Sequence, residues 1–126
     1  MTAKIRPSED GQFIEMIFVG EINRRIAMEQ NQAAHTLGTS LGIRSYLADV
    51  TRAPNTDSVL DQYNFAYQDM RQNEAVDRTA RIAILIDPAD HSHDFIETVG
   101  RNSGLNMKIF TCRQRAIEFL SAEHEI

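Results

Sequence analysis

The feature that most constrains the fold is a regular alternation between two hydrophobic periodicities. Short β-prone apolar runs exchange along the chain with segments whose apolar residues recur every three to four positions, as in amphipathic helices. The expected order of elements is β-β-α-β-α-β-α-β-α. Because strands that alternate with helices run mostly parallel and are joined by right-handed crossovers, this order predicts an α/β fold. We expect a mostly parallel sheet with an N-terminal hairpin and four helices.

The strand-like and helix-like segments are separated by turn residues. The predicted strands are residues 4–6 and 12–20, which form the hairpin, and 43–50, 82–86 and 107–112. The first helix runs from Ile22 to Gly38 or Gly42, and the second begins at Asp57 or Ser58. The second helix is expected to bury one stripe: Val59, Leu60, Tyr63, Ala66, Tyr67 and Met70. In the third helix, which ends at Gly104, the predicted apolar face is Phe95, Ile96 and Val99, and the last helix uses residues 116–120.

The two faces of the predicted sheet differ in polarity. A wholly apolar face is formed by Ile82, Ile84 and Ile86. Elsewhere Lys108 shares a face with Phe110, and Arg44 shares one with Tyr46 and Ala48. A parallel sheet buried on both faces is more uniformly apolar than this. We therefore expect the helices to lie mainly on one side, which leaves a thinly covered, partly polar face available to a partner subunit.

Composition and charge narrow the class of protein. The chain has 126 residues, which fits one domain spanning 1–126. With 42% hydrophobic and 25% charged residues, and no apolar run of membrane-spanning length, disordered and transmembrane classes are excluded. The net charge of -5 argues against nucleic acid as the partner. The single Cys112 allows no intrachain disulfide and the start resembles no signal peptide, so we expect a cytoplasmic protein.

Polar residues gather in the loops that should meet at one edge of the sheet. Ligands of parallel α/β proteins bind beyond the carboxyl ends of the strands, which here means residues 49–58, 87–94 and 111–115. His91 and His93 could serve as metal ligands, but their spacing does not match the His-x-His-x-Asp-His pattern of metallo-β-lactamase-like hydrolases. We favour a helix start capped by Asp90, Ser92 or Asp94. No hydrolase motif surrounds the serines, so we assign no catalytic residue and no metal site.

Two residues around the second helix carry further hypotheses. Ser58 is either the helix N-cap, which we favour, or a phosphoacceptor. At 100° per residue, Phe65 projects opposite the expected apolar stripe and should be exposed. Exposed aromatics are enriched at interfaces, so Phe65 suggests an interaction surface or a ligand lip.

Several short motifs follow one another in a recognisable order. Asp49-Val50-Thr51 closes a strand and Asp57-Ser58 opens a helix. This resembles the Asp-x-Ser and Asp-Ser-Ser-Gly patterns of the STAS domains, the anti-sigma-factor antagonist or SpoIIAA-like family. Residues 81–86, 108–110 and 116–120 look like the later strands and last helix of the same family. The resemblance spans nearly the whole chain and implies a SpoIIAA-like fold, no cofactor and a protein-binding role.

The resemblance carries over to individual positions. Asp49 matches the strand-end Asp of the family, Thr51 its Ser, Asp57 its loop Asp and Ser58 the first Ser of the pair. The serine that is phosphorylated in switching antagonists is the second of the pair, and Val59 holds that place. Ser58, one residue away, is therefore the possible phosphoacceptor.

Three functions remain open at this point. The leading hypothesis is a non-enzymatic regulatory or protein-interaction module that forms a homodimer. The alternative is a binding module for a small apolar or anionic, lipid-like ligand at the carboxyl ends of the strands, and a metal-assisted hydrolase using His91 and His93 is the third. The surface expected to meet a ligand or partner comprises Asp49, Thr51, Asp57, Ser58, Phe65, His91 and His93.

Overall fold

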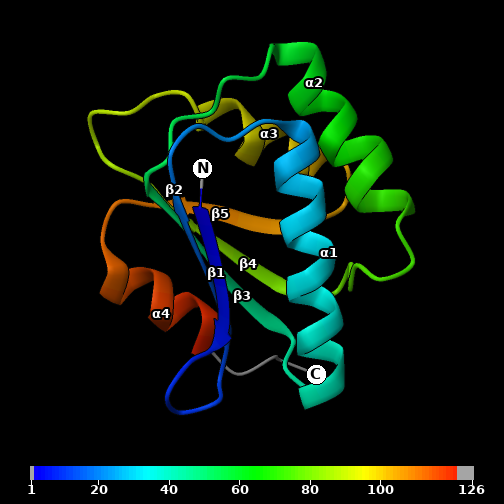
Figure 1. The fold of residues 1–126 in the computed structure, drawn as a ribbon, viewed down its shortest axis with the longest axis vertical. Coiled ribbons are helices and arrows are strands. Elements are labelled where there is room, and N and C mark those ends of the chain that lie inside the picture. The colour runs from blue at the N-terminus through cyan, green and yellow to red at the C-terminus, as the bar shows by residue number, and fades with distance from the viewer. Residues whose placement is uncertain (1, 122–126) are drawn as a thin grey trace.

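The computed structural model describes residues 2–121, except for the side chain of Val59. Its elements are β1 (Thr2–Pro7), β2 (Ile14–Val19), α1 (Arg24–Leu41), β3 (Ser45–Arg52), α2 (Val59–Asn64), the π-helix η1 (Phe65–Met70), β4 (Arg81–Leu85), α3 (Asp94–Asn102), β5 (Asn106–Phe110) and α4 (Arg113–Ser121). Because η1 continues α2 directly, the chain follows the predicted order of strands and helices (Figure 1). None of the helices in this part of the chain combines the length and apolar character needed to cross a membrane.

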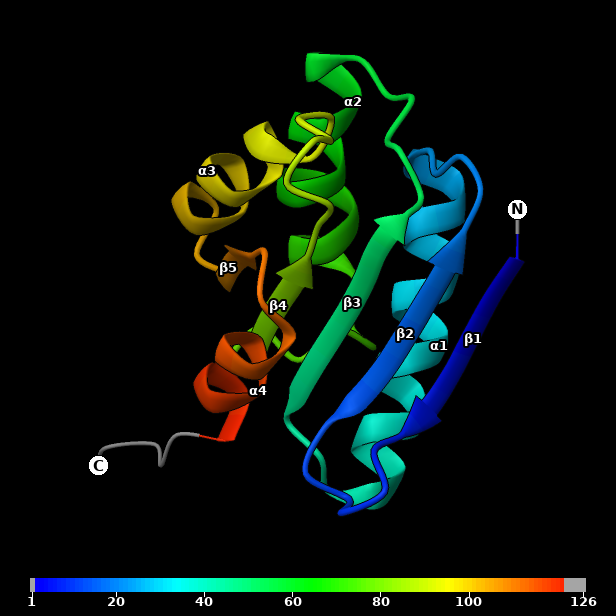
Figure 2. The same cartoon turned by 90° about the vertical axis from the view of Figure 1, so that its left-hand side faces the viewer.

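The strands lie in the sheet in the order of the sequence. Strand order is β1-β2-β3-β4-β5; β1 pairs antiparallel with β2, and the other pairs are parallel. Because each right-handed crossover leads to the next strand in the same direction, α1, α2–η1 and α3 all cover one face. Helix α4 follows the last strand and packs on the opposite face against β3 and β4 (Figure 2). The prediction that the helices lie mainly on one side is confirmed.

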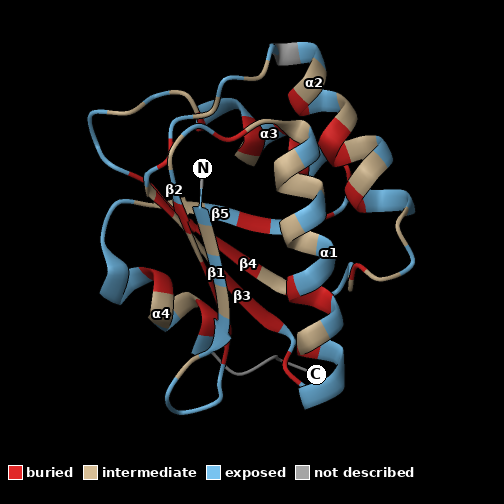
Figure 3. Cartoon of the chain, in the orientation of Figure 1, coloured by how far each residue is buried: buried red, intermediate tan, exposed pale blue. Residues whose placement is uncertain are grey.

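Most of the core lies between the sheet and the three helices on its main face (Figure 3). The parallel register pairs Tyr46 with Ile82 and Ala48 with Ile84, so these side chains share that face. Assigning Tyr46 and Ala48 to the less apolar face was therefore wrong. The polar side of the sheet is the one under α4, where Phe110 packs on the smaller core cluster.

A salt bridge fastens α4 across the opposite face. Glu15 of β2 is only 5% exposed, and Arg113 at the start of α4 donates to its Oε1 atom at 2.7 Å. Arg6 of β1 lies at 3.8 Å from the other carboxylate oxygen. Val19 at the end of β2 is 37% exposed.

The ends of α1 follow from local chemistry. The Asn23 side chain accepts a hydrogen bond from the Ile26 amide, as an N-cap does, and Gly42 ends the helix with a φ of 70°. The predicted start at Ile22 is therefore two residues early. Ile22 instead forms an isolated parallel bridge with Asn55.

The second helix buries a different face from the one its sequence predicts. Phe65 is 8% exposed and lies in the core, whereas Leu60 is 66% and Tyr63 is 46% exposed. The expectation that Phe65 is a surface residue was wrong because α2 and η1 bury the face of Gln62, Phe65, Ala66 and Met70 instead of the predicted stripe. Phe65 and Ala66 lie three and four residues after Gln62, and Met70 lies four after Ala66, so these side chains share one side of the helix. The side chain of Val59, predicted to be buried, lies outside the described set.

The apolar face of α3 also differs at one position. Ile96 and Val99 are buried as predicted, but Phe95 is 37% exposed. Phe95 is therefore a partly exposed aromatic on the helix that packs beside α2.

Helix α1 approaches β3 closely at Gly38. A Cβ atom at this position would lie 2.1 Å from the Tyr46 hydroxyl and 3.0 Å from the Ile43 carbonyl oxygen. Tyr46 is fully buried and its ring stacks on His35 at a centroid distance of 4.0 Å, so it has little room to move. Glycine is required here by packing rather than by backbone conformation.

Gly38→Ala should therefore destabilise the protein, although alanine is normally about 1 kcal/mol better than glycine inside a helix. Overpacking against Tyr46 costs about 1–3 kcal/mol, so after the gain from alanine we expect a net loss of up to about 2 kcal/mol in the free energy of unfolding. Urea denaturation measures this. Thr36→Ala, at an exposed position of the same helix, is the control and should be neutral or stabilising. A stabilised Gly38→Ala variant would contradict the assigned contact.

His35 is a buried neutral imidazole. Its Nδ1 atom accepts a hydrogen bond from the Asp77 amide at 3.0 Å, and its Nε2 atom has no hydrogen-bond partner among the described residues. Burial lowers the pKa of His35 from 6.5 to about 4, although the Asp77 carboxylate acts in the opposite direction. Folding therefore disfavours protonation of this side chain.

Acidification should destabilise the fold through His35. Below pH 6.5 the unfolded chain binds a proton that the folded protein takes up only near pH 4, so stability falls as the pH drops through this window. Titration of this one group can change the free energy of unfolding by at most about 1.4 kcal/mol per pH unit. His35→Phe retains an aromatic ring beside Tyr46 and should lack this slope, even if its stability at pH 7 is lower. Equal slopes in both proteins, measured by denaturation between pH 4 and 7, would rule out His35 as the source.

Candidate functional site

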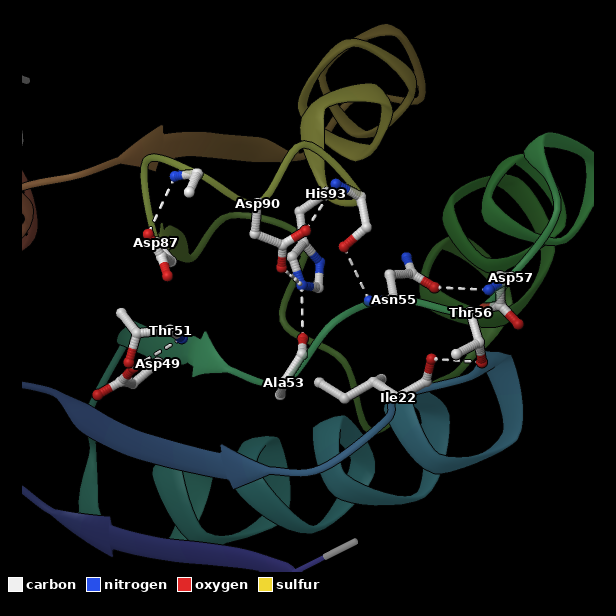
Figure 4. Close-up of polar contacts among 12 residues, drawn as sticks. Ile22, Asp49, Thr51, Ala53, Asn55, Thr56, Asp57, Asp87, Asp90 and His93 are labelled. Atoms are coloured by element: carbon white, nitrogen blue, oxygen red, sulfur yellow. Dashed lines mark hydrogen bonds and ion pairs between the residues drawn. The ribbon is translucent and has the colours of Figure 1, made fainter.

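The chain beyond β3 forms an extended connection, residues 53–58, held on both sides at the carboxyl edge of the sheet. On one side lies the segment before α1: the Ile22 amide donates to the Pro54 carbonyl oxygen at 2.9 Å. The Thr56 amide donates back to the Ile22 carbonyl oxygen at 2.9 Å, and the Thr56 hydroxyl reaches the same oxygen (Figure 4). These bonds extend the pairing of β2 and β3 beyond the sheet.

The loop between β4 and α3 holds the connection from the other side. The Asn55 amide donates to Ser92 Oγ at 2.9 Å, and His93 Nε2 lies 2.7 Å from the Ala53 carbonyl oxygen. A carbonyl oxygen only accepts, so Nε2 carries the proton. His93 is 5% exposed, which makes this contact part of the core (Figure 4).

The two histidines of the predicted site lie in different environments. His91 is an exposed residue whose Nδ1 atom lies 3.0 Å from Asp94 Oδ2, whereas His93 is buried. Asp90 accepts from the Ser92 amide at 2.9 Å, and its hydrogen bonds with Ser92 lower the pKa of the Asp90 carboxyl. Within residues 2–121, no three His, Cys, Asp or Glu side chains are arranged to hold a metal ion.

Ser58 is the N-cap of α2. Its Oγ accepts from the Asp61 amide at 3.1 Å and donates to Asp61 Oδ2 at the same distance. The neighbouring Asp57 is partly buried, and desolvation raises the pKa of its carboxyl. Asp57 and Ser58 are thus adjacent but differ in environment, since Asp57 turns toward the interior and Ser58 lies at the start of α2.

Asp49 and Thr51 lie on the other face of the sheet. They share the strand parity of Leu47, which packs in the core cluster formed with α4. Asp49 Oδ1 accepts from the Thr51 amide at 3.0 Å and from its hydroxyl at 2.7 Å. The predicted site therefore splits: Asp49 and Thr51 lie across the sheet from Asp57, Phe65 and His93.

A cavity of about 80 Å³ lies beneath the connection on the main face of the sheet. Asp57, Phe65 and His93 line it together with residues from β2, β3, β4 and α1. Phe65 thus reaches the interior of a pocket rather than the surface. Gln62 also lines the cavity and was missed by sequence analysis, because a polar residue in a helix is ordinarily solvated and only the packing of α2 against the sheet and its neighbouring helices makes this side the buried one.

The side-chain bond from Ser92 should measurably protect the connection. Ser92→Ala removes the acceptor of the Asn55 amide, so we expect hydrogen exchange at Asn55 to accelerate roughly fivefold, the factor that corresponds to about 1 kcal/mol. The Thr56 amide, which bonds to the Ile22 carbonyl, is the internal control and should change less. Unchanged exchange at Asn55 would show that Ser92 does not hold this segment.

Comparison with known proteins identifies the fold. No protein-family model and no curated protein sequence matches the chain. Among solved structures it is similar to a DUF3478-family protein with a SpoIIAA-like fold from Shewanella loihica PV-4, at 18% identity, a TM-score of 0.55, and coverage of 94% of this chain and 92% of that one. It is also similar to the anti-sigma factor antagonist SpoIIAA in its unphosphorylated form, at 17% identity, a TM-score of 0.54, and coverage of 93% and 96%. The chain therefore has a SpoIIAA-like fold, as its sequence predicted.

Proposed function

We propose that the protein is a non-enzymatic interaction module that binds a partner protein through the outer face of α2. The observation that carries this proposal is an exposed apolar stripe formed by Leu60, Tyr63 and Tyr67. Leu60 is 66% and Tyr63 is 46% exposed. Tyr63 stacks on Tyr67 with ring centroids 4.4 Å apart, which holds both rings in place on the surface.

The composition of this stripe suits a protein interface. Tyrosine is enriched at interface cores because it contributes a large contact area with few rotatable bonds. Asp61 lies on the same helix, so the apolar stripe has an acidic residue near its N-terminal end. We infer that the partner presents an apolar surface with basic residues beside it.

The SpoIIAA-like fold supports an interaction role. SpoIIAA is an anti-sigma factor antagonist and was solved in an unphosphorylated form. In the present chain Ser58 stands at the N-terminal end of the stripe. We propose it as a phosphoacceptor for a kinase that uses ATP. A phosphate there would lie beside Asp57 and Asp61, so like-charge repulsion should disturb the start of α2 and weaken partner binding.

Affinity capture from the source cells tests this proposal. Leu60→Ser and Tyr63→Ser should each reduce capture of the partner at least about tenfold, as truncation of central interface residues does. Ser58→Asp should also reduce capture of the partner, because the substitution adds a negative charge while keeping a side chain that can cap the helix. Leu41→Ser is the matched control: Leu41 is 52% exposed at the far end of α1, and its loss should leave capture unchanged.

The two stripe variants decide whether α2 is the interface. A protein that is captured equally by wild type and by both stripe variants contradicts binding through α2. Native mass spectrometry of the same samples gives the subunit count. A dimer that dissociates in the Leu60 and Tyr63 variants would make the partner a second copy of this chain, in keeping with the predicted homodimer.

A further inference from the structure

The cavity under the connection holds an unpaired polar atom. Gln62 is 6% exposed, lines the cavity, and its Oε1 atom has no hydrogen-bond partner in the described part of the chain. Buried amide oxygens are nearly always paired, because desolvation without a partner is unfavourable. This acceptor is therefore available to a bound molecule.

Acceptor atoms are also present among the other polar residues around the cavity. Asp57 contributes a carboxylate. Asn31 uses its amide nitrogen to donate to the Ala27 carbonyl oxygen at 2.7 Å, which leaves its Oδ1 atom. His93 uses its Nε2 proton on the Ala53 carbonyl oxygen. A molecule that pairs with Gln62 Oε1 must donate a hydrogen bond, and an anionic group would be repelled by Asp57.

The remaining wall is apolar and encloses little volume. Phe18, Phe65 and Ile84 bring two aromatic rings and a branched chain to the cavity from the sheet and from η1. A volume of about 80 Å³ exceeds what a single water needs and is smaller than the roughly 150 Å³ of a cavity that binds benzene. Such a space admits a short alkyl chain of a few carbon atoms.

We propose that this cavity binds a small alcohol or amine, whose hydroxyl or ammonium group donates to Gln62 Oε1 while its short alkyl chain packs against Phe18, Phe65 and Ile84. The proposal differs from an anionic lipid ligand in the sign of its polar end. It does not depend on the interaction proposed for the outer face of α2, because Leu60 and Tyr63 are on the solvent side of that helix.

Titration of the purified protein followed by amide NMR tests the proposal. The probes are 1-butanol, n-butylamine and butyrate at pH 7.5, which share a four-carbon skeleton and differ in their polar end. We expect saturable shifts of the Gln62 side-chain amide and the Phe65 backbone amide with the alcohol, the amine or both, and none with butyrate. Absence of saturable shifts with both donors, or equal binding of butyrate, would overturn the proposal.

Matched variants assign the binding to Gln62. Gln62→Leu keeps a side chain of similar size and removes the unpaired oxygen, so it should fold and weaken binding at least about tenfold. Gln114→Leu, at an exposed position of α4, should bind as wild type does. Unchanged affinity in Gln62→Leu would contradict the assigned acceptor.

Two more variants test the space available in the cavity and the contribution of the Asp57 charge. Ala48→Val adds two methyl groups at the cavity wall and should abolish binding. Asp57→Asn should weaken binding of the amine at least about tenfold and leave the alcohol nearly unaffected, which separates the two donors. Undiminished binding of both donors in Ala48→Val would place the ligand outside the cavity and overturn the proposal.

Discussion

The handedness of the crossovers between parallel strands is the constraint on which the rest of this structure depends. Because β2 to β5 lie side by side in sequence order, each right-handed connection places its helix on the same face. The connections at the carboxyl ends of the strands therefore lead into helices of one layer. The cavity forms between that layer and the sheet. Helix α4 has no strand to lead to, so it is free to pack on the opposite face, where Arg113 pairs with Glu15.

A single helical segment carries both of the proposed functional surfaces. Its inner side carries Gln62 of α2 and Phe65 of η1, which line the cavity, and the buried Met70. Its outer side carries Leu60 and Tyr63, which are exposed. π-Helices are uncommon and are often found at functional sites, because their geometry is rarely favoured by local interactions alone. Arg24 of α1 pairs bidentately with Asp69 of η1, at 2.6 and 2.9 Å, and so ties this segment to its neighbour.

Sequence patterns predicted the elements well and the site only in part. The apolar run around Ile84 and the turn at Gly42 are local signals, and both elements formed where expected. Phe65 was misplaced because the expected apolar stripe included Leu60 and Tyr63, whereas the helix buries the side that carries the polar Gln62. His91 and His93 are two residues apart in sequence, yet one is exposed and the other buried, since only the packing of α3 against the connection decides which imidazole turns inward.

The sequence by itself determined the order of elements, the parallel sheet and the cap at Ser58, because these depend on side-chain periodicity and on bonds between residues a few positions apart. It also supplied short motifs sufficient to anticipate a SpoIIAA-like fold. Only the tertiary structure decided that Asp49 and Asp57 lie on opposite faces of the sheet, that Gln62 is buried without a partner among the described residues, and that Gly38 must stay small beside Tyr46. These outcomes depend on contacts between segments distant in the chain, whose geometry is set by packing and leaves no local pattern to read.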